Sequence, residues 1–156
     1  MWLSCGTDEG RGAGPAAVFI LGATSQNWDI IIMVRPQRVP GEKPLFWTGS
    51  SKEELLSFPE AVKDEIGTAL SVAQFGGKHP KAKPWKGEGG GVLEIVADHR
   101  GDTYRAVYTV KFERAVYVLH AFQKKSPKGR KTPRGEVDLI ARRLRVATED
   151  YEARYG

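Results

Sequence analysis

Three closely spaced segments in the second half of the chain constrain its fold most strongly. Apolar and polar residues alternate along residues 92–97, 103–110 and 115–122, as they do in strands that bury one face. The linkers between these segments, DHRGD and KFER, are short enough to form hairpins. The sequence therefore predicts a meander of three antiparallel strands.

A short strand and two helices are predicted ahead of this meander. The strand is LFWTG, residues 45–49, and it is followed by Ser50 and Ser51, each three residues ahead of a glutamate. That spacing is a capping box, which starts a helix. Apolar residues then recur at helical spacing, but the ring of Pro59 cannot continue a helix. We therefore expect a break there, with Pro59 in the first turn of a second helix.

A final helix is predicted after the meander. Thr132 is a typical N-cap residue, and Pro133 suits the first helical turn. Residues 79–91, between the second helix and the meander, are interpreted as a basic loop. The predicted order is β-α-α-β-β-β-α, an α+β fold with a small, mostly antiparallel sheet, two N-terminal helices and a C-terminal helix. The apolar stripe of that last helix consists of Val137, Ile140, Ala141, Leu144, Ala147 and Tyr151.

The first part of the chain differs in composition from the rest. Its segments GTDEGRGAGP and VRPQRVPGEKP are rich in Gly and Pro and show no amphipathic periodicity. We interpret residues 1–42 as a flexible or non-native N-terminal extension and residues 43–156 as one folded domain. The single Cys5 excludes an internal disulfide and a multi-cysteine metal site. No segment reaches the ~20 apolar residues that cross a bilayer, so we expect a cytoplasmic protein without a membrane partner.

Positive charge is concentrated in one part of the sequence. Residues 111–145 contain eleven Lys and Arg but three Asp and Glu, a net charge of +8, whereas the whole chain carries +5. The remaining residues are therefore net acidic. Such a separation favours a polyanionic partner; the alternative is a solvated basic face that binds nothing.

The candidate chemistry lies on the last two strands of the meander. If the last strand alternates regularly, His120 and Lys124 lie on one side together with Val116 and Val118. On the neighbouring strand, Arg105 is flanked by apolar residues, which is costly unless the guanidinium faces solvent or pairs with an anion. Each residue has a structural alternative: a salt bridge from Arg105 to Glu94 or Asp102, and a satisfied, half-buried imidazole for His120.

Taken together, these residues suit phosphate chemistry. Arg105, His120, Lys124 and Lys125 are expected toward one end of the sheet, near the 79–91 loop. Cations placed where charge develops, together with a group that moves a proton near neutral pH, are what phosphodiester cleavage requires. RNA supplies its own nucleophile, the 2′-hydroxyl, and no cluster of metal ligands is evident, so we expect a reaction without a metal or other cofactor. We expect RNA to be bound by Lys83, Trp85, Lys86, Lys128 and Arg130, with Trp85, Tyr104 and Phe122 as candidates for stacking on bases.

Several motifs resemble one known superfamily. The segments KPLFWTGSSKEELLSFPEAVKDEIGTAL, KPWKGEGGGVLEIV and DTYRAVYTVKFERAVYVLHAFQKKS, with TP ahead of the last helix, resemble the phage-related, HigB-like branch of the RelE/ParE/HigB toxins. The resemblance covers roughly residues 43–148. It implies a RelE-like fold and the toxin of a type II toxin–antitoxin pair, a ribosome-dependent endoribonuclease that cuts messenger RNA. It also implies a cognate helix-turn-helix antitoxin.

The resemblance also assigns roles to residues. Arg105 corresponds to an arginine that contacts the scissile phosphate, Lys124 or Lys125 to a basic residue that neutralises the transition state, and His120 to a histidine of HigB-like relatives. RelE-like enzymes place lysines on the first meander strand, where this chain has Glu94. The general base is therefore open between His120, Glu94 and a lysine.

Two other functions are compatible with the same fold. One is a ParE-like inhibitor of DNA gyrase without nuclease activity, and the other is a catalytically inactive phage-related protein that binds nucleic acid.

Overall fold

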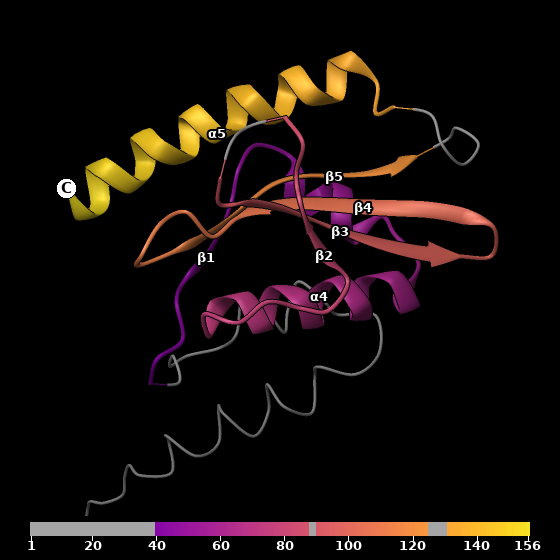
Figure 1. The fold of residues 1–156 in the computed structure, drawn as a ribbon, viewed down its shortest axis with the longest axis horizontal. Coiled ribbons are helices and arrows are strands. Elements are labelled where there is room, and N and C mark those ends of the chain that lie inside the picture. The colour runs from indigo at the N-terminus through magenta and orange to yellow at the C-terminus, as the bar shows by residue number, and fades with distance from the viewer. Residues whose placement is uncertain (1–39, 88–89, 125–130) are drawn as a thin grey trace, which may run out of the picture. The chain divides into compact units, whose positions relative to one another are not determined.

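The computed structural model describes residues 40–87, 90–124 and 131–156. They form one mixed sheet with helices on both of its faces, a mixed α+β fold (Figure 1). The elements, labelled as in Figure 1, are β1 (Leu45–Trp47), α3 (Ser51–Leu56), α4 (Glu60–Gln74), β2 (Ala82–Pro84), β3 (Val92–His99), β4 (Asp102–Thr109), β5 (Val116–Lys124) and α5 (Arg134–Tyr155).

The sheet has the strand order β1-β5-β4-β3-β2. The predicted meander is confirmed, because β3, β4 and β5 pair antiparallel through short connections. The predicted first strand is also present, and β1 pairs parallel to β5 at the sheet edge. Strand β2 was missed, because its three residues, AKP, are too short to alternate. Its Pro84 is tolerated because β2 is the opposite edge strand.

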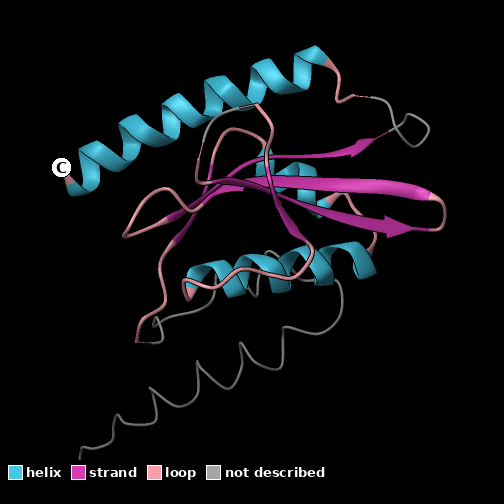
Figure 2. Ribbon diagram, viewed as in Figure 1, coloured by secondary structure: helices cyan, strands magenta, loops and turns pink. Residues whose placement is uncertain are grey.

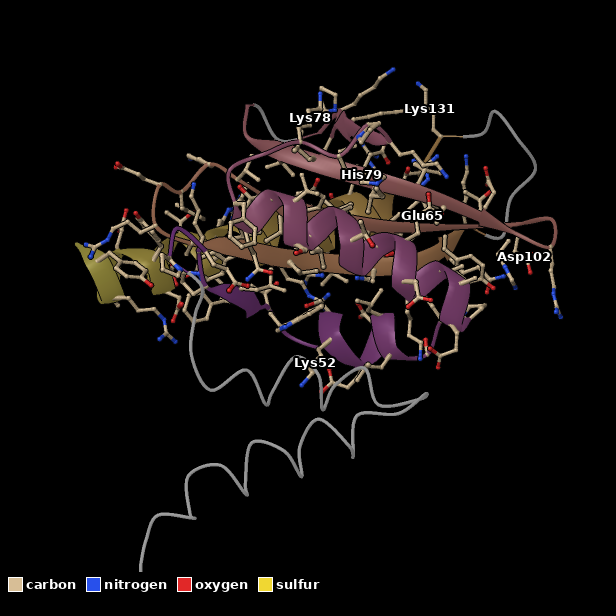
Figure 3. All side chains as sticks on the ribbon, turned by 90° about the horizontal axis from the view of Figure 1, so that it is seen from below. Lys52, Glu65, Lys78, His79, Asp102 and Lys131 are labelled. Atoms are coloured by element: carbon tan, nitrogen blue, oxygen red, sulfur yellow. The ribbon has the colours of Figure 1, made fainter. Side chains whose placement is uncertain are left out.

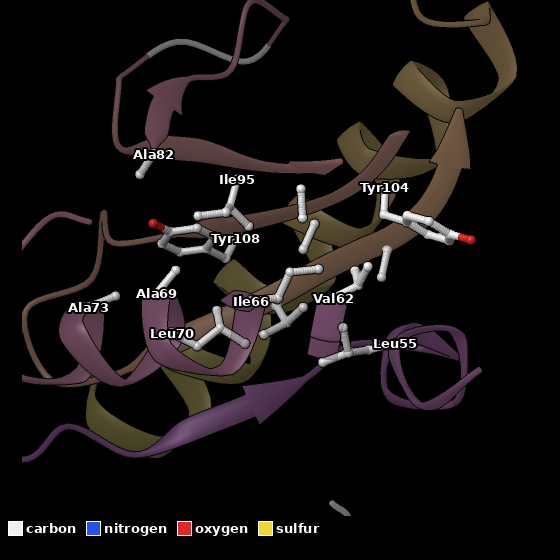
Figure 4. Close-up of a cluster of buried hydrophobic side chains, with 14 of the residues drawn as sticks. Leu55, Val62, Ile66, Ala69, Leu70, Ala73, Ala82, Ile95, Tyr104 and Tyr108 are labelled. Carbon is white, nitrogen blue, oxygen red and sulfur yellow. The ribbon is translucent and has the colours of Figure 1, made fainter. Parts of the chain in front are cut away.

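One hydrophobic layer fills the space between α4 and the sheet. Ile66 and Leu70 from α4 lie against Ile95 from β3 and Tyr108 from β4, as Figure 4 shows, and all four are at most 2% exposed. The helical spacing read from the sequence placed the α4 residues on this face. Burial of side chains of this size stabilises the domain by about 1.5–3 kcal/mol each.

Helix α5 covers the other face of the sheet (Figure 2). Its Ile140 and Ala147 are fully buried against Tyr117 and Leu119 of β5. The Tyr117 hydroxyl donates a hydrogen bond of 2.7 Å to Asp150 of α5, which ties the second half of the helix to the strand. The predicted apolar stripe of the last helix therefore packs on the sheet.

The helix boundaries differ from the expected ones in how they are capped. Helix α3 begins at Ser51 as expected, but the Ser50 hydroxyl donates to the Glu54 carboxylate at 2.7 Å instead of capping the backbone. The predicted break at Pro59 is confirmed, although Pro59 is the N-cap of α4 and not part of its first turn. Pro133, and not Thr132, is the N-cap of α5. The extended backbone of each proline (ψ 150° and 143°) sets it just outside the helix.

Strand β5 contains a bulge that the sequence did not reveal. Val107 of β4 pairs with His120, but the next residue, Tyr108, pairs with Val118, so Leu119 is the extra residue. A bulge of this kind reverses the side to which later residues point. The expectation that Val118 and His120 share a side is therefore wrong: Val118 faces α4, and His120 faces α5.

The described part of the chain begins near the expected start of the folded domain. Glu42 is 8% exposed and accepts a hydrogen bond from the Gln74 side chain, and the Lys43 amide donates to the Gln74 carbonyl. The prediction for residues 1–42 otherwise concerns residues 1–39, which lie outside the described residues. Among the helices that the structure describes, none combines the length and apolarity of a membrane span.

Candidate functional site

The face of the sheet covered by α5 carries a group of polar residues. Residues paired across neighbouring strands point to the same side. Lys83 pairs with Glu94, Glu94 with Val107, and Val107 with His120. Arg105 pairs with Phe122, two residues further along β5. Arg105 and His120 therefore lie on the same face of the sheet.

A pocket of about 580 Å³ opens at this face, between the sheet and the start of α5. Its charged lining residues are two lysines and one arginine, which are cations, and one glutamate, which is an anion. Lys131, which Figure 3 shows projecting from the segment before α5, is exposed, as is Lys86. The pocket is lined by Trp85, Lys86, Gly87, Glu94, Arg105, Lys131, Thr132 and Val137.

An ion pair lies in the wall of this pocket. The Arg105 guanidinium donates to the Glu94 carboxylate at 2.7 Å, and the two side chains are 18% and 13% exposed. The structural alternative for Arg105, a salt bridge to Glu94, is therefore present. Arg105 Nε has no acceptor among the described residues. A guanidinium has five N–H donors, so this ion pair leaves donors for an anionic ligand.

Trp85 forms another part of the pocket wall. Its side chain is 7% exposed and belongs to the hydrophobic layer beneath α5, so it offers little free ring surface for a nucleobase. Its indole Nε1 has no acceptor in the described part of the chain. A side chain at position 87 would come within 2.8 Å of that nitrogen, so Gly87 allows the close approach. Tyr104 and Phe122, the other stacking candidates, are also buried, each 8% exposed.

His120 belongs to a second charged cluster on the same face. Its Nδ1 lies 2.7 Å from Glu54 of α3, and its Nε2 makes a hydrogen bond with Glu136 of α5. Arg143 donates to Glu54 at 3.2 Å and to the carbonyl of Leu119 at 2.9 Å. The His120 ring is 5% exposed and does not line the pocket.

The edge of β5 explains why Glu54 and the residues beside α3 lie close to His120. Strand β1 ends opposite Val118, which leaves the following backbone groups of β5 without a strand partner. The Thr48 hydroxyl donates to the Val118 carbonyl at 2.8 Å, and the Ala121 amide donates to Glu54 at 3.3 Å. Side chains of α3 and its flank therefore replace the missing strand, since buried backbone groups need partners.

The surroundings of Glu54 determine its ionisation. Desolvation alone raises the pKa of this carboxyl, but hydrogen bonds from Arg143 and Ser50 and the charge of His120 outweigh it and lower the pKa from 4.5 to about 2. Glu54 is therefore an anion at neutral pH. The sequence indicated Glu54 as a capping residue. In the structure, the bulge and the tertiary contacts make it instead the anion that faces Ser50, His120 and Arg143.

The remaining predicted residues are distributed as follows. Lys83 is exposed on β2, beside Glu94. Lys124 lies at the end of β5, opposite Thr103. Lys125, Lys128 and Arg130 lie outside the described residues. In the described ranges, no three His, Cys, Asp or Glu side chains are arranged so that they could hold one metal ion.

Sequence reasoning missed several residues of both clusters. Lys131, Thr132 and Val137 line the pocket because α5 begins above it. Glu136 and Arg143 contact His120, although the helical pattern gave no sign of which residues α5 would place there. Their spacing of seven residues, two helical turns, is the one signal that they share a side of the helix.

The fold defines a class of protein. A five-stranded sheet between α4 and α5 is consistent with the RelE-like α+β fold. The model of one family, described as phage-derived protein Gp49-like (DUF891), matches residues 53–145. The chain therefore belongs to the Gp49-like family, a phage-derived family of RelE-like toxins. No curated protein and no solved structure matches the chain.

Proposed function

We propose that this protein is the toxin of a type II toxin–antitoxin system and cuts messenger RNA on the ribosome. The pocket on the α5 face carries the proposal, because it gathers Arg105, Lys86 and Lys131 around the single carboxylate of Glu94. An excess of positive charge in a small hollow suits a phosphodiester, which carries one negative charge and gains more in the transition state. The Gp49-like family supports the toxin assignment.

The proposed reaction uses the substrate's own 2′-hydroxyl. A base removes the hydroxyl proton, the oxygen attacks the adjacent phosphorus, and the bond from phosphorus to the 5′-oxygen breaks. The leaving oxygen takes up a proton, so the products are a 2′,3′-cyclic phosphate and a 5′-hydroxyl. Arg105 contacts the phosphate, and the lysines at the rim neutralise the developing charge.

Among the three candidate bases, the geometry favours Glu94. It lines the pocket beside Arg105, within reach of a phosphate bound there. His120 has both ring nitrogens engaged by carboxylates and is almost completely buried. A carboxylate already paired with a guanidinium can accept a proton while the phosphate takes over part of the guanidinium's hydrogen bonding.

A protein of this kind requires a partner that silences it. We propose a cognate antitoxin that binds the basic pocket face or α5, and a cytoplasmic location where ribosomes are available. Both rest on the family and on the charge distribution.

The test is expression in a bacterial host, followed by mapping of the 5′ ends of cellular messages. The parent chain should arrest growth and create new 5′ ends within translated codons. Arg105→Ala and Lys131→Ala should abolish both effects while the proteins stay folded by circular dichroism. Arg145→Ala, which removes an exposed arginine on α5 outside the pocket, is the matched control and should remain toxic.

Two results would reject parts of this proposal. If Arg105→Ala and Lys131→Ala cut messages as well as the parent does, the site assignment fails. If DNA breaks accumulate while messages stay whole, the protein acts on gyrase.

A further inference from the structure

A carboxylate faces each nitrogen of the His120 ring. Carboxylates that are ionised accept hydrogen bonds and cannot donate them. Glu54 faces Nδ1 at 2.7 Å, and Glu136 faces Nε2 on the opposite side of the ring. Because Glu54 is an anion, the hydrogen bond at Nδ1 needs a proton on that nitrogen, and the same holds at Nε2 for an ionised Glu136.

Arg143 offers the competing arrangement, because its N–H could donate to Nδ1 only if that nitrogen carried no proton. Its NH1 lies 3.0 Å from His120 Nδ1, and both nitrogens lie within 3.2 Å of the same Glu54 oxygen. The shorter distance, 2.7 Å from Nδ1 to that oxygen, favours a proton on Nδ1, so that the carboxylate accepts from both groups. The described charged groups that contact the His120 ring are thus Glu54 from α3 and Glu136 and Arg143 from α5.

The cluster is connected to the pocket by two short routes. Glu136 lies in the first turn of α5, next to Val137, which forms part of the pocket wall. On its other side, the His120 ring stacks on Phe122 at 5.1 Å, and Phe122 pairs across the strands with Arg105. These two routes link His120 to the α5 wall of the pocket and to the strand position of Arg105.

We propose that His120 is a positioning residue: an imidazolium, held between Glu54 and Glu136, that fixes the start of α5 and the position of Phe122, the cross-strand partner of Arg105. It does not exchange a proton with the substrate. The effect of His120 on cleavage rests on the proposed function. The protonation of its ring and its contact with the start of α5 do not.

The first experiment measures the protonation directly. The full chain, labelled with ¹⁵N-histidine, contains His79, His99 and His120. Comparison with His79→Gln and His99→Gln assigns the signals of His120 without altering the cluster. At neutral pH, both ring nitrogens of His120 should have the chemical shifts of protonated nitrogen. A bare nitrogen at either position would overturn the proposal.

The second experiment tests the hold on the pocket. Glu136→Gln keeps the shape of the side chain but weakens the hydrogen bond to His120. Amide exchange at Val137 should accelerate about tenfold, the effect of one lost charge-assisted hydrogen bond, and the Nε–H signal of Arg105 should shift. Glu149→Gln, an exposed glutamate of α5, is the matched control and should change neither. Unchanged exchange and an unchanged Arg105 signal in Glu136→Gln would refute the link.

The third experiment separates positioning from proton transfer in the cleavage reaction. Loss of a general base typically costs on the order of 10²–10⁴-fold in rate. We expect instead that Glu136→Gln and His120→Gln lower cleavage to a similar extent, and that the double variant is no worse than either. The pH–rate profile should keep its shape. If His120→Gln alone removes a limb of the profile, His120 is the base.

These outcomes distinguish the two proposals. A chain that never cuts RNA, yet shows a doubly protonated His120 and an Arg105 signal that responds to Glu136→Gln, keeps the positioning role and loses the proposed function. A chain that cuts RNA while His120 has a bare nitrogen does the reverse.

Discussion

Glu54→Gln removes the anion that faces both His120 and Arg143, and its effect on stability can be worked out from the structure. The folded-state pKa of Glu54 falls from 4.5 to about 2. At about 1.4 kcal/mol per pKa unit, this shift corresponds to at most about 3–4 kcal/mol of free energy of unfolding. One quarter of the side chain is exposed, so solvent screening reduces the contribution, and we expect about 1–2 kcal/mol at neutral pH.

The pH dependence of this loss has a definite sign. A carboxyl whose folded-state pKa is lowered stabilises the protein above the unfolded-state pKa, here near 4.5, and the stabilisation is lost as the pH falls toward about 2. The parent should therefore exceed Glu54→Gln in stability at neutral pH, and the difference should shrink across that acid range.

Urea denaturation at a series of pH values, followed by circular dichroism, measures this difference. Glu53→Gln is the matched control, because Glu53 is an exposed neighbour in the same helical turn. It should change the midpoint by little at any pH. Equal stability of parent and Glu54→Gln at neutral pH, or a difference that does not depend on pH, would refute the reasoning.

Three further substitutions test other parts of the structure. Trp85→Phe removes an indole N–H of the pocket wall that has no acceptor among the described residues. This substitution should weaken the binding of a non-cleavable, deoxy-substituted RNA by about tenfold in calorimetry. An unchanged affinity would exclude that N–H from binding. Tyr108→Phe removes a buried hydroxyl that has no partner among the described residues and whose pKa is raised by burial to about 12. Because no hydrogen bond is lost, the free energy of unfolding should stay equal or rise by up to about 1 kcal/mol. A clear loss of stability in urea denaturation would show that the hydroxyl has a partner. Ile66→Ala opens the fully buried layer under α4 and should cost about 2–5 kcal/mol, whereas a loss below about 1 kcal/mol would mean that the layer is loosely packed.

The sequence predicted the local parts of this fold well. Alternation located β3 to β5, helical spacing located α4, and Pro59 marked the break ahead of it, because each signal depends on neighbouring residues. The side assignment along β5 and the place of Pro59 in a first helical turn were wrong. Strand β2 was missed because three residues at a sheet edge carry no pattern of their own. Its pairing with β3 exists only once the meander has formed.

The candidate site was less accessible to sequence reasoning. The shared face of Glu94 and Arg105 follows from strand alternation, and their ion pair was one of the alternatives considered. The position of His120 depends on the bulge at Leu119, which no local pattern announces. Its partners Glu54 and Glu136 come from two helices far apart in the chain, so only the tertiary structure reveals the cluster.

The chemistry of the cut RNA end tests the central claim most directly. A purified chain incubated with translating ribosomes should leave a 2′,3′-cyclic phosphate, or the 3′-phosphate formed from it, on the upstream fragment and a 5′-hydroxyl on the downstream one, and Arg105→Ala should leave neither. An upstream 3′-hydroxyl paired with a downstream 5′-phosphate, or intact messages, would contradict the pocket's proposed role in attack by the 2′-hydroxyl.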